Sequence, residues 1–388
     1  MAASASAQNT MTSSPYSMFG LGEMASGLYG QNTSMAGVTV GMREGILMNI
    51  ENPAGLTALD SCKLFAEASA FVKNERYRSD GSSSNAFTGN FSAFSLGGRI
   101  MRRWYMSAGV TPYSFVGYYF KSSQELEGSP GTFVTSTFSG TGGLSKAFLS
   151  QGFSLTKHLS VGMNLNFIFG NMTLNEIQSA MTVSREMSGR SFYADFGLQY
   201  HRPIARETFL TVGAIYGYKQ RISLKNTVTV TGSSTETPYN QKRVTQYLPQ
   251  YIGIGSSLAH KKWTYALDYL FRQYGVLNSS DSRVKFRDSH ELRLGVCYFP
   301  NGFSSSSYWK RMSYKAGVSV STPYLRLKGQ SGGAYRVSVG LGLPVLNGRI
   351  NTAFYYDRLQ LQGNALRRDI MGFTVTYTLS EKFYQVKL

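Results

Sequence analysis

Residues 159–170, LSVGMNLNFIFG, decide the fold of this chain. Every second residue from Leu159 to Phe169 is apolar, and the residues between them are mostly Ser, Gly or Asn. Successive side chains of a β-strand point to opposite faces of the sheet, so this period of two predicts a strand with one apolar and one small or polar face. The same alternation recurs over 335–343 and 373–380.

A soluble β-sandwich would show the same alternation, but two features favour strands that cross a membrane. The alternating segments run for about 10 to 13 residues or longer, enough to span a bilayer at a tilt, whereas soluble strands usually have about 5 or 6. Their apolar faces carry aromatic residues near the ends, such as Tyr269, Tyr298 and Tyr335. The composition agrees, with 14% aromatic residues, 15% charged residues and 41 glycines, because such barrels need aromatic girdles, small lumenal residues and few lipid-facing charges.

The predicted fold class is therefore all-β, a transmembrane antiparallel barrel of about fourteen strands, an even number as in single-chain bacterial barrels. Single strands are expected over 206–228 and 241–259. Longer connections, such as 114–130, alternate with short ones, such as 260–262. The longer loops should face the exterior and the short turns the periplasm. No window reaches ~18 uninterrupted apolar residues, so no transmembrane helix is expected.

The stretch 34–59, SMAGVTVGMREGILMNIENPAGLTAL, suits neither a surface helix nor a sheet strand. Its glycines at 37, 41 and 45 recur every four residues, which allows close approach of the backbone to a wall. Pro53 ends any local helix before it. We therefore expect three parts: a signal remnant or disordered N-terminus over 1–14, an N-terminal hatch over 15–61 that plugs the lumen, and the barrel over 62–388.

The formal net charge is +18 and the sequence pI is about 9.8. The basic residues are scattered over expected strand ends and loops, as in Lys219-Gln220-Arg221, Lys261-Lys262 and Arg367-Arg368. We interpret them as solvated charge that, at an outer-membrane surface, could meet lipopolysaccharide phosphates. No nucleic-acid partner is expected, because no nucleic-acid-binding fold signature is present. The cysteines, Cys62 and Cys297, are too far apart in sequence to fit a metal-site spacing.

The N-terminus carries Ala5-Ser6-Ala7, which matches the small-x-small cleavage pattern of a secretory signal. The charged and apolar regions that should precede this pattern are missing from the sequence. The expected location is the bacterial outer membrane, reached by export.

Several stretches resemble the FadL/TodX family of outer-membrane transporters for hydrophobic compounds. They are Asn52-Pro53-Ala54-Gly55-Leu56 after the Gly- and Met-rich run, 107–113, 142–145 and 247–255. The resemblance extends from about Pro15 to Tyr377, and the opening SPYSMFG (14–20) is similar to members from Bacteroidota.

The resemblance implies a fourteen-stranded barrel whose hatch fills the lumen, with a hydrophobic ligand diffusing into an internal pocket and leaving sideways through a wall opening. Such an opening needs a kink or bulge in a strand, and we expect one at Gly97-Gly98 or at Thr111-Pro112. The implied ligand is long-chain fatty acid-like. Outer-membrane lipid would surround the barrel.

The hatch residues expected to line, cap or shape the pocket are Pro15, Tyr16, Phe19, Asn52, Pro53, Ala54 and Gly55. Lumenal charged candidates are Arg99, Arg293, Arg336, Asp195 and Asp268, because they fall on the polar faces of expected strands. An arginine there could hold a ligand carboxylate, or could form salt bridges with Glu67, Asp195, Asp268, Glu291 or Asp357.

No catalytic constellation is evident in the sequence. The four histidines lie apart, no cluster has zinc spacing, and no nucleophile-elbow sequence is present. We expect no enzyme activity, cofactor or metal. Besides transport of a hydrophobic small molecule, two alternatives remain open: a barrel-shaped adaptor or shuttle whose partner is a secreted or surface protein, and a purely structural barrel.

Overall fold

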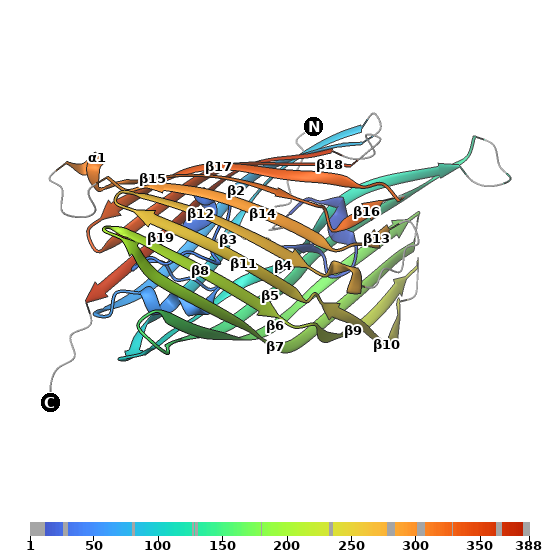
Figure 1. The fold of residues 1–388 in the computed structure, drawn as a ribbon. Helices are drawn as coiled ribbons and strands as arrows, with labels where there is room; N and C mark the ends of the chain where they lie inside the picture. Colours follow the sequence, from blue (N-terminus) through green and yellow to red (C-terminus); the bar gives the residue numbers. More distant parts are fainter. Residues whose placement is uncertain are drawn as a thin grey trace.

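The computed structural model of this protein describes residues 12–25, 30–79, 82–125, 128, 131–179, 181–232, 236–277, 284–300, 307–327, 329–361 and 367–382. These residues form a closed antiparallel β-barrel (Figure 1). Its wall has fourteen strands, which confirms the number expected from the alternation. A continuous ladder between the first and the last wall strands closes the barrel.

Twelve wall strands are uninterrupted segments, and two consist of two pieces each. The wall runs through β2 (Lys63–Ser79), β3 (Ser82–Met101), β4 (Trp104–Glu125), β5 (Phe133–Ser154), β6 (Leu159–Gln178), β7 (Met181–Ala205), β8 (Thr208–Gly217) with β9 (Gln220–Thr231), β10 (Glu236–Leu248) with β11 (Tyr251–His260), β12 (Trp263–Arg272), β14 (Ser289–Tyr298), β15 (Ser313–Ser321), β17 (Gly332–Val345), β18 (Gly348–Leu361) and β19 (Arg367–Lys382).

The expectation of unbroken strands over 206–228 and 241–259 is therefore wrong. The second strand breaks at Pro249, which has no N–H to give to a ladder, and its neighbour breaks at the same level, between Gly217 and Gln220. Strand β7 pairs with both β8 and β9 and carries the wall past the break.

The alternation in 159–170 places apolar side chains toward the lipid. In β6, Leu165 and Phe169 are 43% and 38% exposed, while Asn164 and Asn166, on either side of Leu165, are buried in the lumen. The lumenal amides satisfy buried backbone and carboxylate groups, as Asn164 does by donating to the Ile50 carbonyl at 2.9 Å. One face therefore meets hydrocarbon and the other a polar interior.

The remaining elements are short. They are the 3-10 helices η1 (Pro15–Met18), η2 (Gln31–Met35), η3 (Pro53–Ala58) and η4 (Tyr274–Val276), the helix α1 (Tyr308–Arg311), the strand β1 (Glu23–Met24), and a separate two-stranded sheet of β13 (Val284–Phe286) and β16 (Leu325–Leu327). None of the described helices has the length and apolarity needed to cross a bilayer.

The two rims of the barrel differ. One rim, which we call the turn end, carries the tight connections at 102–103, 261–262 and 346–347, and lies at the left in Figure 1. The other rim, which we call the hairpin end, carries the β2–β3, β4–β5 and β6–β7 hairpins. Short turns on one side and longer hairpins on the other are the arrangement that places the turn end toward the periplasm.

The described residues before Lys63 lie inside the barrel, and we call residues 12–25 and 30–62 the hatch. Helix η3 packs against β4 to β7, and η2 packs against β14, β15, β17 and β18 on the other side of the lumen. Residues 12–24 lie nearer the hairpin end, beside β4.

Glycines on the lumenal face let the hatch backbone touch the wall. They occur on eight wall strands and are Gly152, Gly162, Gly197, Gly213, Gly255, Gly295, Gly317 and Gly340. A Cβ atom at Gly152 would lie 2.7 Å from the Pro53 carbonyl oxygen. A Cβ atom at Gly213 would overlap the Val40 carbonyl oxygen. Several face one another across ladders, as Gly162 does with Gly152 and Gly197. The wall therefore presents an arc of glycines, from β5 round to β17, to the hatch.

We expect Gly213→Ala to destabilise the folded barrel by about 1–3 kcal/mol, the usual cost of overpacking a filled interior, because the new methyl group meets the backbone of Val40. The measurement is the unfolding temperature of detergent-solubilised protein, followed by heat-modifiable gel mobility. Gly333→Ala is the matched control, since a Cβ there meets no atom within 4 Å. Equal unfolding temperatures for the two variants would contradict close packing of the hatch.

Candidate functional site

The barrel wall is split between β3 and β4. Their ladder starts at the turn end and stops at the pair Phe94 and Val110. Beyond it, β3 continues to Ser82 paired only with β2, and β4 continues to Glu125 paired with β5. We call the two diverging edges, 82–93 and 111–125, the seam. In Figure 1 the β2–β3 and β4–β5 hairpins reach the hairpin end well apart.

Irregular residues bend both strands where the seam begins. The β4–β5 register shifts between Pro112 and Ser114, as expected for a proline that cannot donate to a ladder, and the β2–β3 register shifts at Ser69 and Ala70. The kink expected at Thr111-Pro112 is confirmed. The alternative at Gly97-Gly98 is wrong, because both glycines sit in regular ladders on either side.

The first part of the hatch occupies the seam. Strand β1 pairs with the free edge of β4, with Met24 opposite Ser114. The Ala25 N–H donates to the Tyr113 carbonyl at 2.9 Å, and the Ser17 hydroxyl both accepts from the Gly117 N–H and donates to its carbonyl. β1 therefore acts as a short strand added to β4 where β3 has left it.

The other side of this segment is held by charge. The Ser13 N–H donates to the Glu75 carboxylate of β2 at 2.9 Å, and Glu23 forms an ion pair with Arg368 of β19. Burial alone would raise the pKa of Glu23, but the charges of Arg368 and Lys73 outweigh it and hold the pKa below its usual value. The carboxylate of Glu23 therefore stays ionised and keeps its cationic partner.

An apolar cluster fills the lumen on the β4 side of the seam. Leu21 and Met24 of the hatch pack there against apolar side chains from β4, β5, β6, β7 and β9. These wall residues are Val116, Tyr118, Leu144, Ile168, Met172, Tyr193, Ile222 and Leu224. The lumen is thus apolar along one wall, and the hatch side chains Leu21 and Met24 are buried in that region, with Met18 packed against it.

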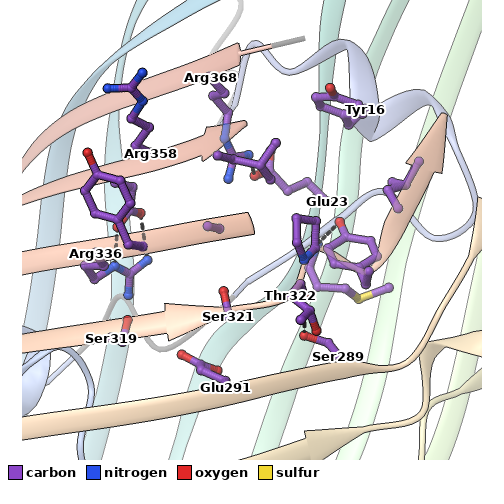
Figure 2. Close-up of a pocket in the computed structure, with 18 of the residues that line it drawn as sticks. Tyr16, Glu23, Ser289, Glu291, Ser319, Ser321, Thr322, Arg336, Arg358 and Arg368 are labelled. Carbon is purple, nitrogen blue, oxygen red and sulfur yellow. Dashed lines mark hydrogen bonds and ion pairs between the residues drawn. The ribbon is translucent and has the colours of Figure 1, made fainter. Parts of the chain in front are cut away.

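A small charged cavity of about 130 Å³ adjoins this cluster, and Met24 and Tyr274 belong to both. Figure 2 shows Glu23 and Arg368 on one side of it and Arg336 and Glu291 on the other. Arg336 forms a bidentate pair with Asp357 at 2.5 and 2.8 Å. A ligand pocket usually has about 300–1,000 Å³, so this cavity holds at most a small group.

A network of buried ions joins this cavity to the hatch. Arg272 and Arg293 both contact Glu291, at 2.7 and 2.8 Å, and both reach Glu51 of the hatch. Arg293 is 1% exposed and also donates to the Gly37 carbonyl at 2.7 Å. Buried charges are tolerated when every one is paired and hydrogen-bonded, and the network ties the hatch to β12 and β14.

The lumenal candidates are spread over several places. Arg336 lines the charged cavity, and Arg293 binds the hatch backbone. Asp195 accepts hydrogen bonds from Asn164 and Asn166, at 2.5 and 2.7 Å. Asp268 accepts the backbone N–H groups of Thr39 and Val40 at 2.7 and 2.9 Å. Arg99 lies at the turn end, where it donates to the Met101 carbonyl.

The residues predicted in the hatch also lie in different places. Tyr16 is buried beside Tyr77, Val284, Leu325 and Leu361 and borders the charged cavity, and Phe19 packs against this group. The side chain of Pro15 lies outside the described part of the chain.

The NPAG motif has a structural part in the hatch. The Asn52 side chain caps η3 by accepting the Ala54 N–H at 3.2 Å, and it donates to the Val40 carbonyl at 2.7 Å. Pro53 and Ala54 touch the wall at Gly162, and Gly55 packs against Asn49.

Residues that the sequence reasoning missed lie around the seam. Glu23, Met24 and Arg368 hold or fill it, and no motif marks them. The apolar lumenal patch did leave a signal, because Ile168 falls on the polar side of the alternation in 159–170. An apolar residue at a lumenal position marks a dry part of the interior.

We expect Asp268→Ala to loosen the hatch, because three successive hatch N–H groups, from Thr39 to Gly41, lose their acceptor. Each unsatisfied buried donor costs about 1–3 kcal/mol. Faster amide hydrogen exchange over 39–41, in protein that still shows the folded gel mobility, is the readout. Asp60→Ala is the control, since its ion pair with Lys63 is partly exposed and holds no hatch N–H group. Unchanged exchange in the Asp268 variant would contradict this tether.

Solved structures with this fold include the Ralstonia pickettii toluene transporter TbuX, with a TM-score of 0.61, 14% identity, and 92% of this chain and 98% of that chain covered. The P. putida toluene transporter TodX has a TM-score of 0.62 and 16% identity, with 92% and 99% covered. A Pseudomonas aeruginosa FadL homologue has a TM-score of 0.62 and 11% identity, with 93% and 100% covered. These likenesses establish the FadL/TodX-type barrel fold.

No curated protein matches this chain. One family model, described as BamG, matches residues 1–387. The chain, a barrel with the FadL/TodX-type fold, belongs to the BamG family.

Proposed function

We propose that this protein carries hydrophobic small molecules across the outer membrane, with the seam as a lateral exit and β1 as its gate. The observation that carries the proposal is the coincidence of three features: an interrupted β3–β4 ladder, a hatch strand on the free edge of β4, and an apolar lumenal wall next to both. The solved structures that share the fold include transporters named for toluene and a channel named for monoaromatic hydrocarbons.

Ligand entry would compete with the hatch for the same apolar surface. Leu21 and Met24 are buried against the lumenal wall, and burying such a side chain contributes about 1.5–3 kcal/mol. A hydrophobic molecule that takes their place recovers this energy, because it also leaves water. The displaced segment includes β1, so binding and opening of the seam are coupled.

Within this class we propose elongated molecules with one anionic end, such as a long-chain fatty acid. The apolar wall runs over β4 to β9, and the charged cavity with Arg272, Arg336 and Arg368 faces the lumen from β12, β17 and β19. An anionic end would have to replace a carboxylate that now pairs with one of these arginines. Glu23 is the natural one to leave, since it moves with the hatch.

A disulfide that locks β1 to β4 should block uptake. Met24 and Ser114 are directly opposite, and the adjacent pair carries the hydrogen bond from Ala25 to Tyr113. Opposite Cα atoms without mutual hydrogen bonds are about 4.5 Å apart, within disulfide range. In a Cys62→Ser, Cys297→Ala background, Met24→Cys with Ser114→Cys should take up labelled oleate or toluene at least tenfold more slowly when oxidised than when reduced.

The matched control is Leu267→Cys with Leu294→Cys, an opposed pair without mutual hydrogen bonds in the continuous β12–β14 ladder. Its oxidation should leave uptake unchanged. Uptake would be measured in cells that lack their own transporter for these compounds. Equal uptake by the oxidised and reduced seam variant would overturn the proposed gate, and comparing oleate with toluene tests the anionic end.

One observation favours the adaptor as a second candidate. The β4–β5 hairpin extends past the rest of the hairpin end in Figure 1, and it exposes Tyr119 (69%) and Phe133 (63%). Exposed aromatic residues on a projecting element suit a protein partner. If the adaptor reading holds, Tyr119→Ser with Phe133→Ser should lose a co-purifying surface protein while oleate uptake stays unchanged. Absence of any co-purifying protein from native membranes would contradict it.

A further inference from the structure

A cationic hollow lies on the outside of the barrel, away from the lumen and the seam gate. Strand β2 alternates between buried lumenal residues, such as Lys73 and Glu75, and exposed residues on the lipid side. The exposed set changes from Val72 to Asn74, Arg76 and Arg78 toward the hairpin end. Apolar contact with lipid therefore ends on β2 at Val72, and two arginines follow.

Neighbouring strands bring further basic residues to the same face. Arg367 of β19 lies directly opposite Arg78, and Asp369 lies opposite both Arg76 and, on the other side, Arg358 of β18. Like charges placed directly opposite in an antiparallel pair repel. Four arginines thus share one outward face on three adjacent strands.

The carboxylate of Asp369 is the acidic group that faces these arginines. It lies 2.8 Å from Arg367 in an ion pair and 3.8 Å from Arg358, and it accepts a hydrogen bond from the Tyr356 hydroxyl at 2.7 Å. Among the described residues, Arg76 and Arg78 form no ion pair. The outward face of these strands therefore carries an excess of positive charge, and the guanidinium groups of Arg76 and Arg78 are not paired with a carboxylate of the described residues.

These groups border a hollow of about 380 Å³, which is lined by Asn74, Arg76, Arg78, Asn85, Tyr356, Arg367, Asp369 and Met371. Besides the arginines, the two asparagines add amide donors. A guanidinium fork matches the geometry of phosphate oxygens. The lining therefore suits a phosphate group better than an apolar ligand.

The height of the hollow on the wall identifies where the phosphate would come from. The residues next to it toward the turn end are apolar and exposed, with Met371 at 57%, Phe373 at 41% and Phe354 at 50%. Tyr335 and Tyr356, whose ring centroids are 6.2 Å apart, mark the same level. Aromatic residues at the edge of an apolar band mark the bilayer interface, so the arginines lie at the depth of lipid headgroups.

We propose that this hollow binds the phosphate of a lipid in the outer leaflet, with Arg76 and Arg78 as its main contacts. The site is independent of the transport proposal, because its side chains face away from the lumen. It holds a lipid against β2, β18 and β19.

The test uses native mass spectrometry of the full chain in mild detergent, titrated separately with diphosphorylated lipid A, the same lipid without phosphates, and inorganic phosphate. The wild type should bind the phosphorylated lipid at least tenfold more tightly than the dephosphorylated one. The double variant Arg76→Gln with Arg78→Gln should bind the phosphorylated lipid roughly tenfold or more weakly than the wild type. It lacks the two guanidinium groups that would donate charge-assisted hydrogen bonds to the phosphate.

The matched control is Arg102→Gln with Arg103→Gln, which removes the same charge from exposed positions at the turn end. It should bind the phosphorylated lipid as the wild type does. Heat-modifiable gel mobility confirms that each variant is folded. Any of three results would overturn the proposal. The wild type could bind the two lipids equally tightly, the two double variants could weaken lipid binding equally, or inorganic phosphate could bind as tightly as the phosphorylated lipid.

Discussion

The structure depends on how an irregular segment of backbone is housed inside a barrel. The hatch has little regular secondary structure, so its N–H and C=O groups need partners from the wall. Side chains from several wall strands provide these partners. Asp268 accepts hydrogen bonds from the N–H groups of residues 39–41. Gln199 donates to the Val40 and Met42 carbonyls, and Ser338 accepts from the Ala36 N–H. These bonds require close approach, and the lumenal glycines provide it.

The same requirement explains why the lumen is uneven. Where the hatch is held by hydrogen bonds and ion pairs, the wall is polar, as around Arg293 and Glu51. Where Leu21 and Met24 contact it, the wall is apolar. The seam lies next to the apolar part, and β1 replaces a missing neighbour by giving β4 a short ladder. The hatch is thus at once the core of the barrel and a piece of its wall.

Much of this fold could be predicted from the sequence. The alternation in segments such as 159–170 predicts the strands, and their length predicts that they cross a membrane. The Gly-rich run before Asn52 is predicted to have a different structure because it lacks this alternation. Pro112 marks a bulge because a missing N–H is a local property. The split itself is not local, since it depends on where the β3–β4 ladder stops, and neither strand changes composition at Phe94 or Val110. The sites around Glu23 and Arg368 join residues 345 positions apart, and no spacing rule links them.

Enclosure of the hatch also constrains the order in which the chain can assemble. A segment with the side chains of Met35, Met42 and Leu56 fully buried inside the barrel cannot be threaded into a cylinder that has already closed. The ladder between β2 and β19 joins residues about as far apart in sequence as the wall allows, and it is the one that seals the cylinder. Folding therefore wraps an open, curving sheet around the hatch, and the first and last strands meet only after the interior has been filled.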